Sequence, residues 1–191
     1  VSGTANLLGS MDDFGIKKII FSSSCAVYGT PEKMPVTEET PIRPESVYAE
    51  TKAMAEKILL WYEKQRGFEC TILRYFNVAG ASHGTGEMSG RMVSNALGAA
   101  LGGHVLDIYG NDYPTRDGTC IRDYVHVEDI AQAHIRSMRK TGTYNIGYGN
   151  GISNMEMVGI VEEVTGKGIR LRISPRRPGD PAEIFADGSK A

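Results

Sequence analysis

Short apolar runs alternate with longer helical segments along all 191 residues of the chain. Runs such as "KKIIFSSS" (17–24) and "FECTILRYF" (68–76) have the length and the β-branched content of buried strands. Between them, as over 46–64, apolar residues recur every three or four positions, which is the spacing of a helix. This alternation predicts an α/β fold, with a parallel sheet at the core and a smaller mixed α/β part after it.

The same periodicity predicts the bounds of the remaining elements. Ser46 and Ser153 are suitable helix N-caps, and Glu156 follows Ser153 at capping-box spacing. In chain order we predict a helix to residue 14, strands at 17–24 and 68–76 with the helix from Ser46 between them, a helix at 91–101, strands at 105–110 and 120–127, a helix at 128–140, a strand at 143–147, a helix at 152–166, a strand at 169–174 and an extended tail.

Composition excludes several classes of protein. With 41% hydrophobic and 23% charged residues, the chain suits one soluble globular unit. No run is long enough to span a bilayer and the first residues lack a signal-peptide pattern, so we expect a cytoplasmic protein with no membrane partner. A formal net charge of -2 argues against a nucleic-acid partner. Cys25, Cys70 and Cys120 lack disulfide or metal-site spacing, so we expect no metal.

A tyrosine and a lysine lie four positions apart at the start of the predicted helix "SVYAETKAMAEKILLWYEK". Residues at this spacing share one helix face, so Tyr48 and Lys52 can meet. An ammonium group beside a phenol favours the phenolate, and the pair could therefore act as a general base. The same spacing also occurs on ordinary helix surfaces, so the neighbouring residues must decide between the two interpretations.

Three consecutive serines, Ser22, Ser23 and Ser24, end the first predicted strand. In open α/β sheets, ligands bind at the carboxyl ends of the strands. The helix that carries Tyr48 and Lys52 begins after the following loop, so a hydroxyl, a phenol and a cation would surround one point. The alternative is a polar strand exit with no role in binding.

Six segments resemble one protein family, in that family's order: "FSSSCAVYG", "YAETK", "LRYFNVAGA", "GNDYPTRDGTCIRDYVHVEDIAQAH", "YNIGYG" and "PRRPGDPAEIFADGSKA". They resemble the extended short-chain dehydrogenase/reductase proteins and, within these, the UDP-glucose 4-epimerases. The resemblance covers essentially the whole chain. It implies part of a Rossmann-like parallel sheet over 1–78 with later segments near 121–150, and a UDP-sugar-binding part over 79–120 and 151–191.

The resemblance also implies a role for each matching residue. NAD would be the cofactor and a UDP-sugar the substrate; Tyr48 would be the catalytic base, Lys52 would hold the nicotinamide ribose, and Ser24 would bind the reacting sugar hydroxyl. Ser22, Ser23 and Phe76 would border the cofactor. The predicted substrate contacts are Asn77, Arg122 and Arg177 at the diphosphate, Asp180 at the uridine ribose, Asp107, Ile108 and Tyr109 at the uracil, and Ile184 at the sugar.

Two departures from the family pattern bear on function. No G-x-x-G-x-x-G follows a strand in this chain, so we expect a fragment whose cofactor-binding glycines lie upstream of Val1. The segment "GEMSGRMVSNALGAALGG" is short, which affects substrate contacts near Asn95. His126 within its strand is expected to be structural, and Asp117 and Asp123 form no evident hydrolytic pair.

Three functions remain open. The first is epimerisation at C4 of a UDP-hexose, UDP-glucose to UDP-galactose and back, through a 4-keto sugar. The second is a sister reaction, a 4,6-dehydratase or a decarboxylase, although Cys25 and Ala26 offer no carboxylate after Ser24. The third is a non-catalytic UDP-sugar-binding fragment.

Two further expectations concern assembly and specificity. The helix after Tyr48 carries more apolar surface than one core face needs, which resembles the family's dimer helix and predicts a homodimer. The middle size of Ile184 predicts a preference for UDP-glucose and UDP-galactose, with weaker activity on N-acetylated sugars.

Overall fold

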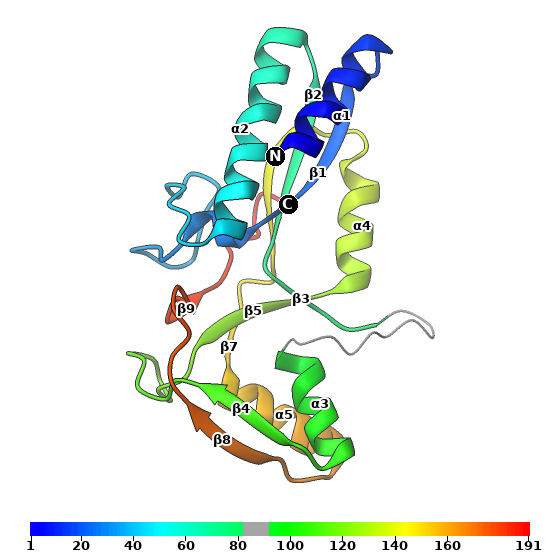
Figure 1. The fold of residues 1–191 in the computed structure, drawn as a ribbon. Coiled ribbons are helices and arrows are strands. Elements are labelled where there is room, and N and C mark those ends of the chain that lie inside the picture. Colours follow the sequence, from blue (N-terminus) through cyan, green and yellow to red (C-terminus); the bar gives the residue numbers. More distant parts are fainter. Residues whose placement is uncertain (82–91) are drawn as a thin grey trace.

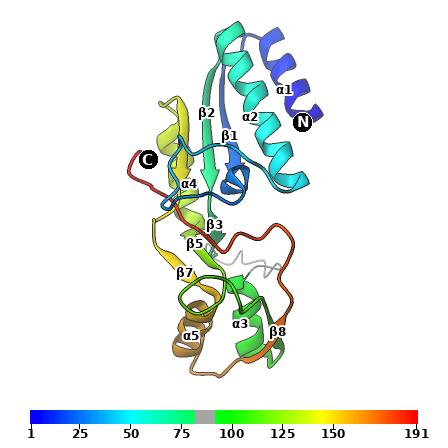
Figure 2. The ribbon, with the colours of Figure 1, turned by 90° about the vertical axis from the view of Figure 1, so that its left-hand side faces the viewer.

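The computed structural model describes residues 1–81 and 92–191, which form an upper and a lower part in Figure 1. The upper part is built on a parallel three-stranded sheet in the order β1 (Lys18–Ser24), β2 (Glu69–Tyr75) and β6 (Gly142–Ile146). Helices α1 (Ser2–Asp13) and α2 (Val47–Arg66) cover one face of this sheet, and α4 (Val127–Ser137) covers the other (Figures 1 and 2). The predicted parallel α/β core is confirmed.

Alternation along the strands explains why helices cover both faces of the sheet. Ile19, Phe21 and Ile72 pack toward α1 and α2, against Leu8 and Leu59. The intervening Ile20 and Leu73 pack instead in a second apolar cluster, with Val125, Ile130 and Ile146. A strand buried on both faces reads as a continuous apolar run, and this is what residues 19–21 and 72–73 show in the sequence.

The lower part has a mixed sheet and a separate strand pair. The mixed sheet contains β3 (Asn77–Ala79), β5 (Ile121–His126), β7 (Gly151–Ser153) and β9 (Glu183–Ile184), with β7 antiparallel to β5. The strand pair is β4 (Val105–Tyr109) with β8 (Arg170–Ser174), and it lies beside α3 (Met92–Gly102) and α5 (Asn154–Thr165) (Figure 1). Ala96, Ile108, Val158 and Val161 belong to the core of this part.

Most predicted elements are present, and the differences concern short segments. The sequence analysis missed β3, β7 and β9, because two or three residues show no periodicity. It also missed the 3-10 turn η1 (Cys25–Tyr28). The predicted start of a helix at residue 91 lies outside the described residues, as do residues 86–90 of the shortened segment. No helix among residues 1–81 and 92–191 has the length and hydropathy needed to span a bilayer.

A buried carboxylate connects β5 to two later segments. Asp123 has no exposed surface. Its oxygens accept hydrogen bonds from the backbone N–H groups of Tyr148 and Gly149 and from that of Ala186 in the tail. Since these backbone contacts occupy both oxygens, the hydrogen bonds of Asp123 serve to hold the structure together.

The capping box that was predicted at Ser153 begins α5. The Ser153 hydroxyl accepts from the N–H of Glu156 at 3.0 Å, and the Glu156 carboxylate accepts from the N–H of Ser153 at 2.8 Å. Arg116 from the loop before β5 also donates to Glu156, at 2.7 Å. The Arg116 hydrogen bond, together with the Ser153 N–H, lowers the pKa of Glu156 from 4.5 to about 2.

We predict that Glu156→Ala lowers the free energy of unfolding by about 1 kcal/mol near neutral pH, because it removes half of the capping box. A carboxylate with a depressed pKa stabilises the fold above its ordinary value of 4.5, and this stabilisation is lost as the pH falls toward about 2. The difference between wild type and variant in urea unfolding should therefore shrink at low pH. Glu163→Ala, at an exposed position in the same helix, is the control and should show no such trend.

Candidate functional site

The Tyr48 and Lys52 side chains lie at the carboxyl end of β1, where α2 begins. The Ser46 hydroxyl caps α2 by accepting from the N–H of Ala49 at 3.1 Å. Lys52 Nζ donates to the backbone oxygen of Ser22 at 2.8 Å and lies 5.8 Å from the centre of the Tyr48 ring. Tyr48 is 55% exposed, so a ligand can reach its hydroxyl. The structure thus brings the predicted pair together beside the serine run.

The three serines have three different environments. Ser24 accepts from the N–H of Ala26 at 3.2 Å and caps η1. Ser22 is exposed and accepts from the Tyr75 hydroxyl at 2.8 Å. Ser23 is 2% exposed, and its hydroxyl donates to the buried Glu56 at 2.5 Å. The predicted cofactor contact of Ser23 can therefore involve only its backbone, because its side chain is directed into the protein.

One pocket adjoins this strand end, and a second pocket shares part of its lining. One, of about 280 Å³, lies between the segment after β1 and the tail; the other, of about 250 Å³, lies between β4, β5 and α3. Both are lined by Asn77, Arg122 and Asp180. The first also includes Ile184, and the second also includes Asp107, Tyr109 and Arg177. Seven of the eight predicted substrate residues therefore gather at two pockets with shared walls.

The charges at these pockets include two guanidinium groups. The Arg122 side chain is 11% exposed and forms an ion pair with the Asp180 carboxylate at 3.6 Å, while its Nη1 donates to the backbone oxygen of Ile121 at 2.9 Å. The Arg177 guanidinium stacks 3.6 Å from the centre of the Tyr109 ring. Guanidinium groups match the oxygens of a phosphate, so this arrangement can bind a diphosphate in a protein with a slightly negative net charge.

Asp107 is held by an arginine from the neighbouring strand. Arg172 Nε and Nη2 donate to its two oxygens at 2.6 and 2.7 Å, and Ser174 adds a hydrogen bond at 3.0 Å. The Arg172 and Ser174 hydrogen bonds lower the pKa of Asp107 to about 2. Asp107 is therefore a fixed acceptor at the rim of the second pocket over the ordinary pH range.

Besides Ser23, three apolar predicted site residues have buried side chains. Ile108 is completely buried in the lower core, so the structure assigns its side chain to packing and leaves only its backbone for the predicted substrate contact. Ile184 is 3% exposed and packs in the same apolar cluster as Phe76, while it also lines the first pocket. Phe76 is 4% exposed, close in sequence to the pocket residue Asn77.

The sequence analysis missed two polar residues in the second pocket, Tyr124 and Asn154. The Tyr124 hydroxyl is buried and has no hydrogen-bond partner among the described residues, and burial raises its pKa to about 12. Tyr124 lies two positions after Arg122 in β5, so both side chains share one face of the strand, and this period of two could have pointed to Tyr124. Asn154 directly follows the N-cap of α5 and gave no comparable signal.

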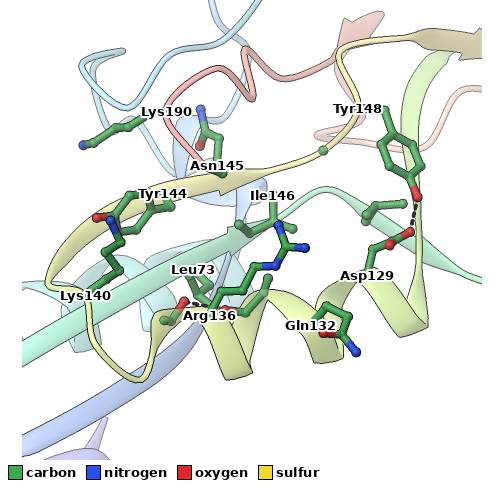
Figure 3. Close-up of a pocket in the computed structure, with 15 residues that line it drawn as sticks. Leu73, Asp129, Gln132, Arg136, Lys140, Tyr144, Asn145, Ile146, Tyr148 and Lys190 are labelled. Atoms are coloured by element: carbon green, nitrogen blue, oxygen red, sulfur yellow. Dashed lines mark hydrogen bonds between the residues drawn. The ribbon is translucent and has the colours of Figure 1, made fainter.

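A cavity of about 400 Å³ lies elsewhere, between α4, β6 and the chain end (Figure 3). Arg136, Lys140, Tyr144 and Lys190 are among the side chains that line it. None of the predicted site residues does so. Its volume exceeds that of either pocket lined by Arg122, but none of the residues predicted to bind cofactor or substrate lines it.

The residues at the end of β1 fit part of a nicotinamide cofactor. Lys52, held by the Ser22 backbone, and the exposed Tyr48 leave an ammonium and a phenol open toward the strand end. They can hold a ribose, but the glycine-rich turn that would bind a dinucleotide pyrophosphate is absent from the 191 residues. The fit is therefore limited to the nicotinamide side of the cofactor.

The chain is similar to curated and solved proteins along its whole length. It is 44% identical to a UDP-glucose 4-epimerase from Lactobacillus helveticus, over 100% of the chain and 62% of that protein. A UDP-glucose 4-epimerase from Brucella ovis, solved in complex with NAD, matches with a TM-score of 0.91 at 38% identity, over 100% of the chain and 62% of that structure. One from Bifidobacterium longum, solved with NAD+ and UDP, matches with a TM-score of 0.88 at 39% identity, over 98% of the chain and 60% of that structure.

The chain thus spans about three fifths of the length of these relatives. The model of the NAD dependent epimerase/dehydratase family matches residues 1–147, which include β1, the Tyr48–Lys52 pair and β5. This match covers well over half of the sequence, and the chain belongs to the NAD dependent epimerase/dehydratase family.

Proposed function

We propose that this chain is the catalytic and substrate-binding part of a UDP-glucose 4-epimerase, which interconverts UDP-glucose and UDP-galactose. The observation that carries this proposal is the Tyr48–Lys52 pair at the end of β1 together with two pockets that share Arg122 and Asp180, the first of which is also lined by Cys25 after β1 and by Ser46 before α2. Relatives named UDP-glucose 4-epimerases, with 41–44% identity over the chain, support the choice of reaction. Residues 1–78 with 121–150 would form the cofactor side, and 79–120 with 151–191 the UDP-sugar side.

Each side chain has a definite task in this reaction. A bound NAD would supply hydride transfer at C4 of the sugar. Tyr48 takes the proton of the 4-hydroxyl as general base, Ser24 orients that hydroxyl, and Lys52 holds the nicotinamide ribose. Arg122 and Arg177 bind the diphosphate, so they hold the nucleotide while the 4-keto sugar turns over. A segment outside these 191 residues would supply the glycine-rich turn.

We predict that Tyr48→Phe lowers the interconversion of UDP-glucose and UDP-galactose by at least about 100-fold in the protein that carries this chain, because it removes the oxygen that takes the proton. Turnover is measured in a coupled assay for either product. Tyr62→Phe, on the same helix, is the matched control and should keep its activity. A Tyr48→Phe enzyme within a few-fold of wild type would contradict the assignment.

The two alternatives give different results in the same preparation. A 4,6-dehydratase would release a 4-keto-6-deoxy sugar, which the epimerase does not form. A decarboxylase would require a uronic acid substrate. A non-catalytic fragment would bind UDP in calorimetric titration without Tyr48-dependent turnover in any longer form of the protein. The dehydratase is not favoured, because Cys25 and Ala26 place no carboxylate beside Ser24.

Substrate range is proposed to depend on Ile184, which lines the first pocket with Arg122 and Asn77. Ile184→Val should raise kcat/KM for N-acetylated UDP-hexoses relative to UDP-glucose by about tenfold, because one methylene less relieves a clash. The larger Ile184→Tyr would also overpack the surrounding core, so the smaller change is the sharper test. Val36→Ala, in the same cluster but in neither pocket, is the control. An equal loss on both substrate pairs would show that Ile184 only packs.

We propose a cytoplasmic homodimer that forms through α1 and α2. These two helices pack against each other through Leu8, Leu59 and Tyr62. Their outer surface exposes Leu7, Met54 and Trp61, by 53%, 41% and 60%. An exposed apolar patch on two adjacent helices is typical of a contact between subunits.

Trp61→Glu is therefore expected to give a monomeric mass in sedimentation equilibrium, where the wild-type protein gives a dimer. The charge would be buried without a partner in the contact, which disfavours association. Val164→Glu introduces the same charge at a residue of α5 that is 77% exposed, and it should leave the dimer intact. A monomeric wild-type protein would refute the dimer.

A further inference from the structure

Two charged side chains are buried together between α2 and the upper sheet. Glu56 is 1% exposed and Arg74 is 5% exposed. Arg74 Nε and Nη2 donate to the two oxygens of Glu56 at 3.1 and 2.7 Å, which is a bidentate ion pair. The reaction proposed above uses neither residue.

The ion pair is the centre of a hydrogen-bond network. Glu56 also accepts from the Ser23 hydroxyl in β1, at 2.5 Å. Arg74 Nη1 donates to the Tyr28 hydroxyl at 2.8 Å, and Tyr28 donates to the Asn145 side chain at 2.6 Å. The network therefore connects α2, β1, β2, η1 and β6 through polar contacts that are buried.

The network contacts both segments that carry the reactive groups. Glu56 follows Lys52 by four positions and Tyr48 by eight, so the three residues lie on successive turns of α2. Ser23 lies between Ser22, whose carbonyl holds Lys52, and Ser24. A hydrogen bond from Ser23 to Glu56 thus fixes α2 against β1 one turn away from the contact between Lys52 and Ser22.

Stability alone does not account for this arrangement. The free energy needed to remove an ion pair from water is about as large as the free energy of attraction between its charges. Apolar side chains of similar volume therefore often stabilise a core better. A bidentate pair does supply one fixed geometry, since both partners must keep their positions and angles. Catalytic groups need such fixed geometry, because a displacement of about 1 Å can cost about 100-fold in rate.

We propose that Glu56 and Arg74 are positioning residues, which act through Ser23 to hold Lys52 and Tyr48 in register with Ser24. This inference rests on the proposed function, since it concerns the rate of the same reaction. Replacing the two residues is expected to disturb the geometry of the reactive groups while the binding of the UDP-sugar is retained. Replacing residues that only pack in the core would not have this effect.

The main test replaces both charges in the protein that carries this chain. Glu56→Leu combined with Arg74→Met replaces the ion pair by apolar side chains of similar volume. The thermal unfolding midpoint should therefore stay near that of wild type. The turnover number kcat should fall about 100-fold. KM for UDP-glucose should stay within about threefold, because Arg122 and Arg177 are not touched. A purely structural ion pair would instead give wild-type kcat once stability is retained.

A second variant decides the question if the double variant does not fold. Ser23→Ala removes only the hydroxyl between β1 and Glu56 and leaves the ion pair intact. Its kcat should fall about tenfold with unchanged KM. Thr71→Val is the matched control: it removes another buried hydroxyl, which donates to the Lys140 backbone at 2.6 Å in the same sheet, and it should keep wild-type kcat.

The outcomes separate this inference from the proposed function. A folded double variant with wild-type kcat, or a Ser23→Ala enzyme no slower than Thr71→Val, overturns the positioning role while Tyr48-dependent turnover still supports the epimerase. A wild-type protein without Tyr48-dependent turnover overturns both.

Discussion

The arrangement of the site depends on the hydrogen bonds that the Asp123 carboxylate accepts. It accepts three backbone hydrogen bonds in a place without solvent, two from the turn after β6 and one from the tail at Ala186. Buried hydrogen bonds to a charged acceptor are among the stronger ones in proteins, and leaving such a charge unpaired is costly. The turn and the tail are therefore held against β5, in which Arg122 directly precedes Asp123.

This attachment explains how residues far apart in sequence share one pocket. Arg122 belongs to β5, whereas Asp180 and Ile184 belong to the tail that Asp123 holds. Asn77 comes from β3, which pairs with β5 in parallel register. The residues that line both pockets therefore derive from β5 and from segments attached to it. A glycine at 147 is required here, because an added Cβ would come within 2.5 Å of the Asp123 carboxylate.

Elements with clear periodicity could be predicted from the sequence, and so could contacts within one element. The Tyr48–Lys52 contact follows from spacing on one helix, and Tyr124 could have been placed beside Arg122 by the strand period. The same period shows that Ile108 faces opposite to Asp107 and Tyr109, so the prediction of a substrate contact for its side chain was avoidable. Contacts between distant segments, such as Arg122 with Asp180 or Arg74 with Glu56, depend on the tertiary fold, and a single sequence carries no local signal for them.

The serine run has a further consequence for how the chain finds its register. Three identical residues are chemically degenerate: displaced by one position, β1 would still present a serine to Glu56 and a carbonyl to Lys52. The serines at the end of β1 therefore do not distinguish the native register from one displaced by one residue. The preceding apolar residues specify the register instead. A shift by one residue would move Ile19 and Phe21 from the α1–α2 side of the sheet to the α4 side, and Ile20 in the opposite direction. The alignment of the polar site is encoded in the apolar residues before it.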